Sequence, residues 1–268
     1  MGKPHPPEPR RYRSIWISDV HVGTRGCKTE FLLDFLRHHE AENLYLVGDI
    51  LDFWRLRRGT GAWHQGHNDV IQKLLRKARK GARVVYIPGN HDEAAVDYAG
   101  LQFGGVAVAL EAVHVTVDGR RLLVTHGHRF DAVVQNARWL ARLGSWAYDL
   151  ALLLNGGLNA ARRRLGYPYW SLSAYLKHKV KNAVEFIGDF RSVLAAEARH
   201  RGFDGVVCGH IHHPEISAEA GMLYLNCGDW IESCSALVEH QDGRLEIVYW
   251  TALQGDEPRH AEADAVAA

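Results

Sequence analysis

The chain has 268 residues, 47% of them hydrophobic, and a formal net charge of +1. It is long enough to bury a large core, and its near-neutral balance gives no reason to expect a polyanionic partner such as nucleic acid. Its four cysteines are widely spaced, with no C-x-x-C pair. This spacing argues against a zinc ribbon or a disulfide framework and fits a reducing, cytoplasmic compartment.

Both ends of the chain are polar. Residues 1–10 are proline-rich and lack the apolar centre of a signal peptide. We expect residues 1–10 and 255–268 to be disordered tails, flanking a single domain over residues 11–254. No uninterrupted apolar run reaches the length of about 18 residues that a membrane-spanning helix needs, so none is expected.

Five short apolar runs each lead to a polar residue that can bind a metal. In chain order they reach Asp19 (RSIWISD), Asp49 (NLYLVGD), Asn90 (RVVYIPGN), His126 (RLLVTHG), and His210 with His212 (GVVCGHIH). Such β-branched and aromatic runs, bounded by Gly or Pro, are typical of strands. Residues 29–39 and 68–80 lie between the early runs and have apolar residues at helical spacing. The alternation predicts an α/β fold in which ligands gather where strands end.

The later strands follow one another without intervening helices. Asp-Gly pairs at 118–119 and 242–243 predict hairpin turns between them. We therefore predict two mixed sheets packed together, with helices outside.

Taken singly, an Asp after a strand is usually a turn residue or a helix cap. Taken together, these strand ends offer oxygen and imidazole donors with no thiol beside them except Cys208. Such a set suits two divalent ions that share a carboxylate. We expect Mn²⁺, with Fe²⁺, Co²⁺ or Zn²⁺ as alternatives.

The sequence resembles the calcineurin-like metallophosphoesterase superfamily. Its five motifs stand here in family order, as DVH at 19–21, GDILD at 48–52, GNHD at 89–92, HGH at 126–128 and GHIH at 209–212. The resemblance implies that the first ion is held by Asp19, His21 and His212, the second by Asn90, His126 and His210, and that Asp49 bridges them. It also implies that hydroxide formed from a water between the ions attacks a phosphoryl group.

The resemblance implies further roles around the metals. His91 would face the leaving-group oxygen, and Asp92 would hold its ring in position. Asp52 would either support the site or cap the following helix, and His128 would support the site or contact the substrate. We expect His213 at the surface.

Residues 132–200 lie between the fourth and fifth motifs and are predicted to be a helical insertion. Residues 138–181 carry eight Lys or Arg against one acid, a local charge of +7. One interpretation is a helical subdomain with its own small core and a solvated basic face. The other is a lid that offers an apolar stripe to a lipid and positive charge to phosphates or an anionic membrane. Under the second, the candidate substrate contacts are His128, Arg129, Trp139, Arg162, Lys177 and Lys181.

Within the superfamily, the length, the insertion and the segment NCGDW at 226–230 are similar to the UDP-2,3-diacylglucosamine pyrophosphatase branch. That resemblance implies a four-layer αββα fold with a helical lid. It implies hydrolysis of a UDP-linked diacylated sugar to UMP and an acylated sugar 1-phosphate. It also implies a peripheral location on the cytoplasmic face of the inner membrane, with no obligate protein partner.

The sequence departs from that branch at two positions, where the branch typically has Arg in place of His91 and Asp in place of His128. A phosphate leaves without a proton, so a charge alone can assist it, whereas an alkoxide gains about a hundredfold from a general acid. His91 therefore keeps open the alternative of a broader phosphodiesterase or phosphomonoesterase. A non-catalytic metal-bound adaptor is a third hypothesis, which the complete set of motif residues disfavours.

Overall fold

The computed structural model describes residues 9–130 and 190–251. The chain divides into two units, residues 1–128 with 195–268 and residues 129–194. The sequence-predicted substrate contacts Trp139, Arg162, Lys177 and Lys181 lie outside the described residues. Of the predicted tails, only residues 9 and 10 are described, and Arg10 is already part of a strand. The predicted single domain and its insertion stay predictions.

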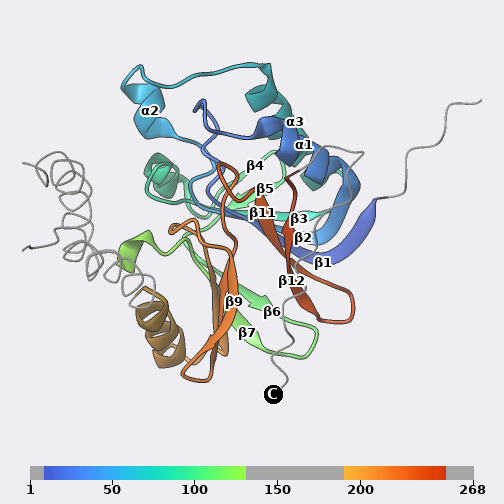
Figure 1. Cartoon of the computed structure of the whole chain (residues 1–268), viewed down its shortest axis with the longest axis vertical. Helices are drawn as coiled ribbons and strands as arrows, with labels where there is room; N and C mark the ends of the chain where they lie inside the picture. The colour runs from blue at the N-terminus through green and yellow to red at the C-terminus, as the bar shows by residue number, and fades with distance from the viewer. Residues whose placement is uncertain (1–8, 131–189, 252–268) are drawn as a thin grey trace, which may run out of the picture. The chain divides into compact units, whose positions relative to one another are not determined.

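A seven-stranded sheet forms one layer of the first unit (Figure 1), in the order β12-β11-β1-β2-β3-β5-β4. Its strands are β1 (Arg10–Ile17), β2 (His39–Val47), β3 (Arg83–Ile87), β4 (Gln102–Phe103), β5 (Val106–Val108), β11 (Ser235–Glu239) and β12 (Leu245–Tyr249). Strands β1, β2, β3 and β5 are parallel, and the others are antiparallel to their neighbours. The carboxyl ends of the parallel strands therefore meet at one edge of the sheet.

A five-stranded sheet forms the second layer, in the order β6-β7-β8-β10-β9. Its strands are β6 (Ala112–Val115), β7 (Arg121–Val124), β8 (Gly205–Cys208), β9 (Glu215–Glu219) and β10 (Met222–Asn226). Strands β7, β8 and β10 are parallel, and the edge strands β6 and β9 are antiparallel to their neighbours. Gly119 and Gly243 have positive φ in the hairpins β6–β7 and β11–β12, as the two Asp-Gly pairs predicted.

Strand β1 is buried on both faces, which explains its nearly continuous apolar sequence. Trp16 points into the layer between the sheets with Val207 and Leu225. Ile15 and Ile17 point the other way, toward the helices α1 (Thr29–His38) and α3 (Gln65–Arg79). The two sheets thus pack face to face, with a helical layer on the outer face of the first sheet.

The remaining helices make smaller contributions to the fold. They are α2 (Phe53–Arg57), the 3₁₀ helices η1 (Glu93–Tyr98) and η2 (His128–Phe130), and a helix described from residue 190 to 200. In the last of these, Ala195 and Ala198 are buried, and the Arg199 guanidinium donates to the Ala220 carbonyl in the β9–β10 turn. The predicted α/β fold with two mixed sheets is confirmed.

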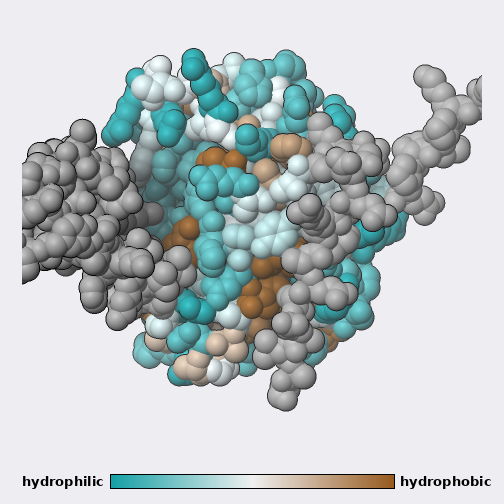
Figure 2. All heavy atoms as spheres, in the orientation of Figure 1, coloured by the Kyte–Doolittle hydropathy of each residue, from teal (hydrophilic) through white to brown (hydrophobic). Residues whose placement is uncertain are grey.

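The described surface that faces the viewer in Figure 2 is mostly hydrophilic, with separate small apolar patches. None of the helices in residues 9–130 and 190–251 has the length and apolar character needed to cross a bilayer.

Candidate metal centre

The loops after β1 and β2 are joined along their backbones. The N–H of Asp19 donates to the Gly48 carbonyl at 3.0 Å, and the N–H of His21 donates to the Asp49 carbonyl at 2.9 Å. A parallel bridge between Val22 and Leu51 continues the pairing beyond the strands. The first two motifs are therefore held side by side at the carboxyl edge of the first sheet.

Most of the sequence-predicted ligands have a left-handed backbone. The φ angles are 51° at Asp19, 51° at His21, 53° at Asp49, 72° at His210 and 54° at His212. Among the non-glycine residues that the structure describes, only Ala220 and Cys234 share this conformation. Such strain costs on the order of 1–3 kcal/mol per residue and persists where the surrounding structure imposes it, most often at functional sites.

Six predicted ligands form two groups. Asp19, His21 and His212 each offer one ligand atom, and these atoms lie within 4.8 Å of one another; the same holds for Asp49, His126 and His210. Asp49 lies between the groups, because its Oδ2 is 3.5 Å from His126 Nε2 and 3.8 Å from His21 Nε2.

Asn90 is placed by the glycine before it. A Cβ at Gly89 would lie 2.3 Å from Asp49 Oδ1 and 2.7 Å from His126 Cδ2. Only a glycine lets the third motif approach the bridging carboxylate this closely. Asn90 is therefore the next residue after Gly89, whose backbone packs against Asp49 and His126 of the second group.

Several buried ligand atoms have no hydrogen-bond partner in the described part of the chain. They are Asp19 Oδ1, His21 Nε2, Asn90 Oδ1 and His126 Nε2. The other atom of each imidazole is occupied: His126 Nδ1–H donates to the Val47 carbonyl at 2.9 Å, and His21 Nδ1 lies 3.2 Å from Asp52 Oδ2. Such outer contacts fix the ring and present Nε2 to a metal. Buried polar atoms are rarely left unpaired, so these residues fit metal ions.

The electrostatics of the cluster favour positive charge. Burial raises the pKa of Asp49, but His126, His21 and the N–H of His91 together lower it further, so the net pKa lies well below the ordinary value. Burial lowers the pKa of His126, yet the Asp49 carboxylate raises it to about 10. Divalent cations would supply the positive charge that these buried carboxylates attract.

The prediction that Asp92 holds the His91 ring is wrong. The Asp92 carboxylate accepts hydrogen bonds from the backbone N–H of Gly89 at 2.5 Å and of Ile50 at 2.7 Å, and from the Tyr86 hydroxyl at 2.5 Å. None of its hydrogen bonds within the described residues goes to His91. Asp92 instead links the third motif to the second, because its oxygens accept hydrogen bonds from backbone N–H groups of both loops.

Asp52 takes the place that was predicted for Asp92. Its Oδ2 lies 3.1 Å from His91 Nδ1, and its Oδ1 accepts the N–H of Arg55 at the start of α2. Asp52 therefore caps α2, while its support of the site stays a prediction. Burial raises the pKa of Asp52, but the hydrogen bond with His21 and further contacts lower it to about 2, so the residue is a carboxylate near neutral pH.

Trp54 is a contact that the sequence did not predict. Its ring centroid lies 4.4 Å from that of His91, and 43% of its surface is exposed. The only signal in the sequence was a tryptophan two residues after the second motif, and a tryptophan in that position is equally compatible with core packing.

The other predicted site residues are less closely placed. The ring of His128 lies 5.4 Å from that of His126. Arg129 is exposed, and His213 is exposed as expected. The contact of His128 and Arg129 with a substrate stays a prediction.

The two ligand groups are of the kind that a metal-dependent hydrolase uses. Residues 12–214 match the model of the calcineurin-like phosphoesterase family, so the chain belongs to that family.

Its curated relatives include enzymes with one shared name. A UDP-2,3-diacylglucosamine hydrolase of Aliivibrio fischeri (strain MJ11) is 25% identical over 247 residues, which cover 85% of this chain and 94% of the relative. One of Aeromonas salmonicida (strain A449) is 26% identical, covering 84% of this chain and 89% of the relative. Among solved structures, the Escherichia coli phosphoesterase Yfce is 19% identical with a TM-score of 0.46, over 90% of this chain and 94% of Yfce.

Proposed function

We propose that the chain is a dinuclear-metal phosphohydrolase that cleaves the pyrophosphate of UDP-2,3-diacylglucosamine, or of a closely related nucleotide-linked lipid, to UMP and an acylated sugar 1-phosphate. The observation that carries the reaction class is the pair of buried ligand groups, Asp19 with His21 and His212 and Asp49 with His126 and His210, each with its ligand atoms within 4.8 Å of one another. The support for the substrate is the name shared by relatives that align over more than four-fifths of the chain.

Two divalent ions would be held by the seven strand-end residues. Asp19, His21 and His212 would bind one ion, Asn90, His126 and His210 the other, and Asp49 both. When bound, such ions supply Lewis acidity toward the phosphoryl group. We propose Mn²⁺, with Fe²⁺, Co²⁺ and Zn²⁺ as the alternatives that this donor set accepts.

His91 is proposed as the general acid. Asp52 faces its Nδ1 and stabilises the ring with a proton on that atom, which leaves Nε2 to carry a proton to the leaving-group oxygen. The pairing of an imidazole with a carboxylate favours a second candidate, a broader phosphodiesterase or phosphomonoesterase. In that reaction the alkoxide leaving group needs the proton more than a phosphate does.

Membrane association is a further part of the proposal. An enzyme for this lipid would act as a peripheral protein on the cytoplasmic face of the inner membrane. The excess of basic residues in 138–181 would contact anionic headgroups, each cation contributing about 1 kcal/mol near the surface.

A substrate panel in Mn²⁺ separates the two candidates. UDP-2,3-diacylglucosamine, bis-(4-nitrophenyl) phosphate and 4-nitrophenyl phosphate are compared by kcat/KM. The first proposal expects the lipid to be the preferred substrate by at least about a hundredfold, because remote binding energy is used in the transition state. Turnover of the simple esters without turnover of the lipid would leave only the second candidate.

A further inference from the structure

Lys77 is a buried amine on the inner face of α3. It follows Val70 and Leu74 along the helix face that packs on the first sheet, a position that helical periodicity gives to an apolar residue. Only 8% of Lys77 is exposed, and its Nζ donates to the His39 carbonyl at 2.5 Å. A buried lysine without a carboxylate in direct contact is unusual, so its surroundings need an explanation.

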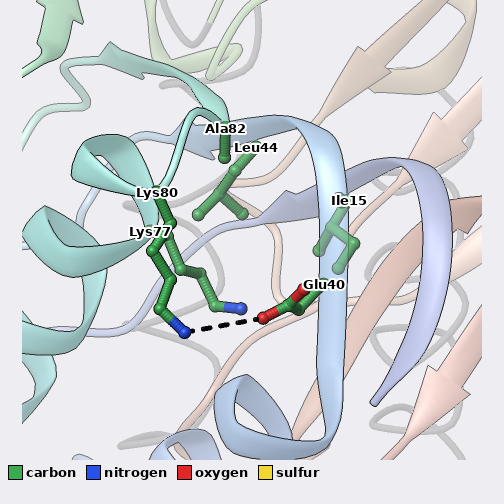
Figure 3. Close-up of a pocket in the computed structure, with 7 residues that line it drawn as sticks. Ile15, Glu40, Leu44, Lys77, Lys80 and Ala82 are labelled. Atoms are coloured by element: carbon green, nitrogen blue, oxygen red, sulfur yellow. Dashed lines mark ion pairs between the residues drawn. The ribbon is translucent and has the colours of Figure 1, made fainter. Parts of the chain in front are cut away.

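The amine lines a cavity of about 60 Å³ between α3 and the first two strands. The lining residues are Ile15, Glu40, Ala41, Leu44, Lys77, Lys80 and Ala82. Figure 3 shows the chains of Lys77 and Lys80 extending toward Glu40 on β2, with Lys80 Nζ 3.9 Å from Glu40 Oε1. A water needs about 10–15 Å³ of such space, so a group of a few atoms fits beside the amine.

The charges around the cavity are mostly positive. Burial, followed by the charge of Lys73, lowers the pKa of Lys77 to about 8, with Lys80 acting in the same direction and Glu40 against it. Burial and the charge of Lys80 also lower the pKa of Lys73. His39 adds no charge, because burial lowers the pKa of its ring to about 4. The cluster thus favours a neutral, nucleophilic amine at Lys77.

We propose that Lys77 is a carbamylation site that takes up carbon dioxide. The lone pair of the neutral Nζ attacks the carbon of CO₂ and forms a C–N bond. One C=O electron pair moves onto oxygen, and one N–H proton leaves to solvent, so that R–NH₂ and CO₂ give R–NH–COO⁻ and H⁺. Carbon dioxide is small and uncharged, and it therefore enters the cavity without the desolvation cost of an ion.

The product suits the site better than the ammonium does. The carbamate nitrogen keeps one N–H, which can still donate to the His39 carbonyl. An anion replaces a cation beside Lys73 and Lys80, so two repulsive interactions become attractive. Among the groups around Lys77 that the structure describes, Glu40 is the one that opposes the change.

Chemical trapping on the native protein tests the proposal. The protein is equilibrated with ¹³C-bicarbonate near pH 7.5, treated with triethyloxonium to ethylate carbamates, digested, and analysed by mass spectrometry. Lys77 should carry at least about tenfold more label than Lys28 and Lys80, which are exposed to solvent and lack the buried surroundings that favour a neutral amine. Label on Lys77 equal to or below that on these internal references would overturn the proposal.

Two variants of the cavity give opposite expected signs. Lys80→Gln should reduce labelling of Lys77 severalfold, because it removes a cation that favours both the neutral amine and the anionic product. Glu40→Gln should increase it, because it removes the opposing carboxylate. Lys77→Arg keeps the positive charge and a donor for the His39 carbonyl and should abolish the label, while Lys28→Arg should leave it unchanged. Labelling that does not respond to either cavity variant would contradict the proposed electrostatic origin.

Discussion

The metal centre and the residues around Glu239 are two clusters of buried polar and charged side chains in the first unit. They differ in how many of their buried polar atoms make hydrogen bonds. In the metal centre, four buried ligand atoms make no hydrogen bond to the described residues, although two of them lie near another ligand, Asp19 Oδ1 at 3.2 Å from His212 Nε2 and His126 Nε2 at 3.5 Å from Asp49 Oδ2. Around the fully buried Glu239 at the end of β11, both carboxylate oxygens accept hydrogen bonds, from Arg13, Ser14, His114 and the N–H of Val117. His114 uses its other nitrogen for the Tyr45 hydroxyl at 3.2 Å.

The difference separates a binding site from a structural crosslink. The Glu239 cluster joins β1 and β11 of the first sheet to β6 of the second, and its residues have ordinary backbone angles, whereas most of the predicted metal ligands have a left-handed backbone. Equal burial therefore carries no functional information. What distinguishes a ligand site is burial combined with missing partners and imposed strain.

Metal removal should separate the two clusters most clearly, because it should abolish activity and leave the fold intact. Dialysis against a chelator should reduce phosphoester hydrolysis at least about a thousandfold, because the ions contribute several kcal/mol of transition-state stabilisation. Circular dichroism should show that the fold persists, since the Glu239 cluster needs no ligand. Restoration of activity by Mn²⁺ is the control, and full activity of the stripped protein would contradict the metal-centre assignment.

Removal of the Glu239 carboxylate should lower the stability of the fold and leave the catalytic rate unchanged. Glu239→Ala should lower the free energy of unfolding by about 1–3 kcal/mol, because it leaves the hydrogen-bond donors around it without their acceptor, while the folded fraction keeps its kcat. In metal-free protein, Asn90→Ala should change that free energy by less than about 1 kcal/mol, since Asn90 Oδ1 accepts no hydrogen bond from the described part of the chain. Urea titration measures both. Equal destabilisation by the two substitutions would remove the contrast.

The carboxylates beside His91 allow a sharper test within the metal centre. His91→Ala should lower kcat about a hundredfold for esters with poor leaving groups and much less for activated esters. Asp52→Asn should reproduce part of this loss, about tenfold, because it no longer stabilises the imidazolium. Asp92→Asn should reduce stability by about 1–3 kcal/mol without changing the dependence on leaving group. A leaving-group effect in Asp92→Asn but not in Asp52→Asn would restore the original assignment.

Acid should weaken the Glu239 cluster gradually. Burial raises the pKa of Glu239, but the hydrogen bonds from His114 and others lower it to a net value below the ordinary 4.5. Its carboxylate therefore stabilises the fold fully above pH 4.5, and this contribution is lost as the pH falls through the lower, folded-state pKa. The stability difference between wild type and Glu239→Gln should shrink over that range in urea titrations. A difference that grows as the pH falls would contradict the assigned sign.

The sequence allowed the sheets, both Asp-Gly hairpins and the family to be predicted, because each depends on local pattern. It did not reveal that Asp52 rather than Asp92 faces His91. Both carboxylates flank the site in the chain, and only the path of the backbone decides which one points at the ring. Lys77 was similarly hidden, since a lysine in an amphipathic helix is normally assigned to the solvated face.

The backbone links between the first two motifs have a consequence for ion exchange. The N–H groups of Asp19, His21 and Val22 donate to the loop after β2, and the N–H of Asp52 donates back to Val22. The backbone hydrogen bonds therefore fix Asp19, His21 and Asp49 when the chain folds, so the entropy cost of ordering them does not fall on ion binding. Ions of different radius then have to be accommodated by the ligands that follow strands of the second sheet. Selectivity among divalent metals should therefore be altered most readily by changes around His126, His210 and His212.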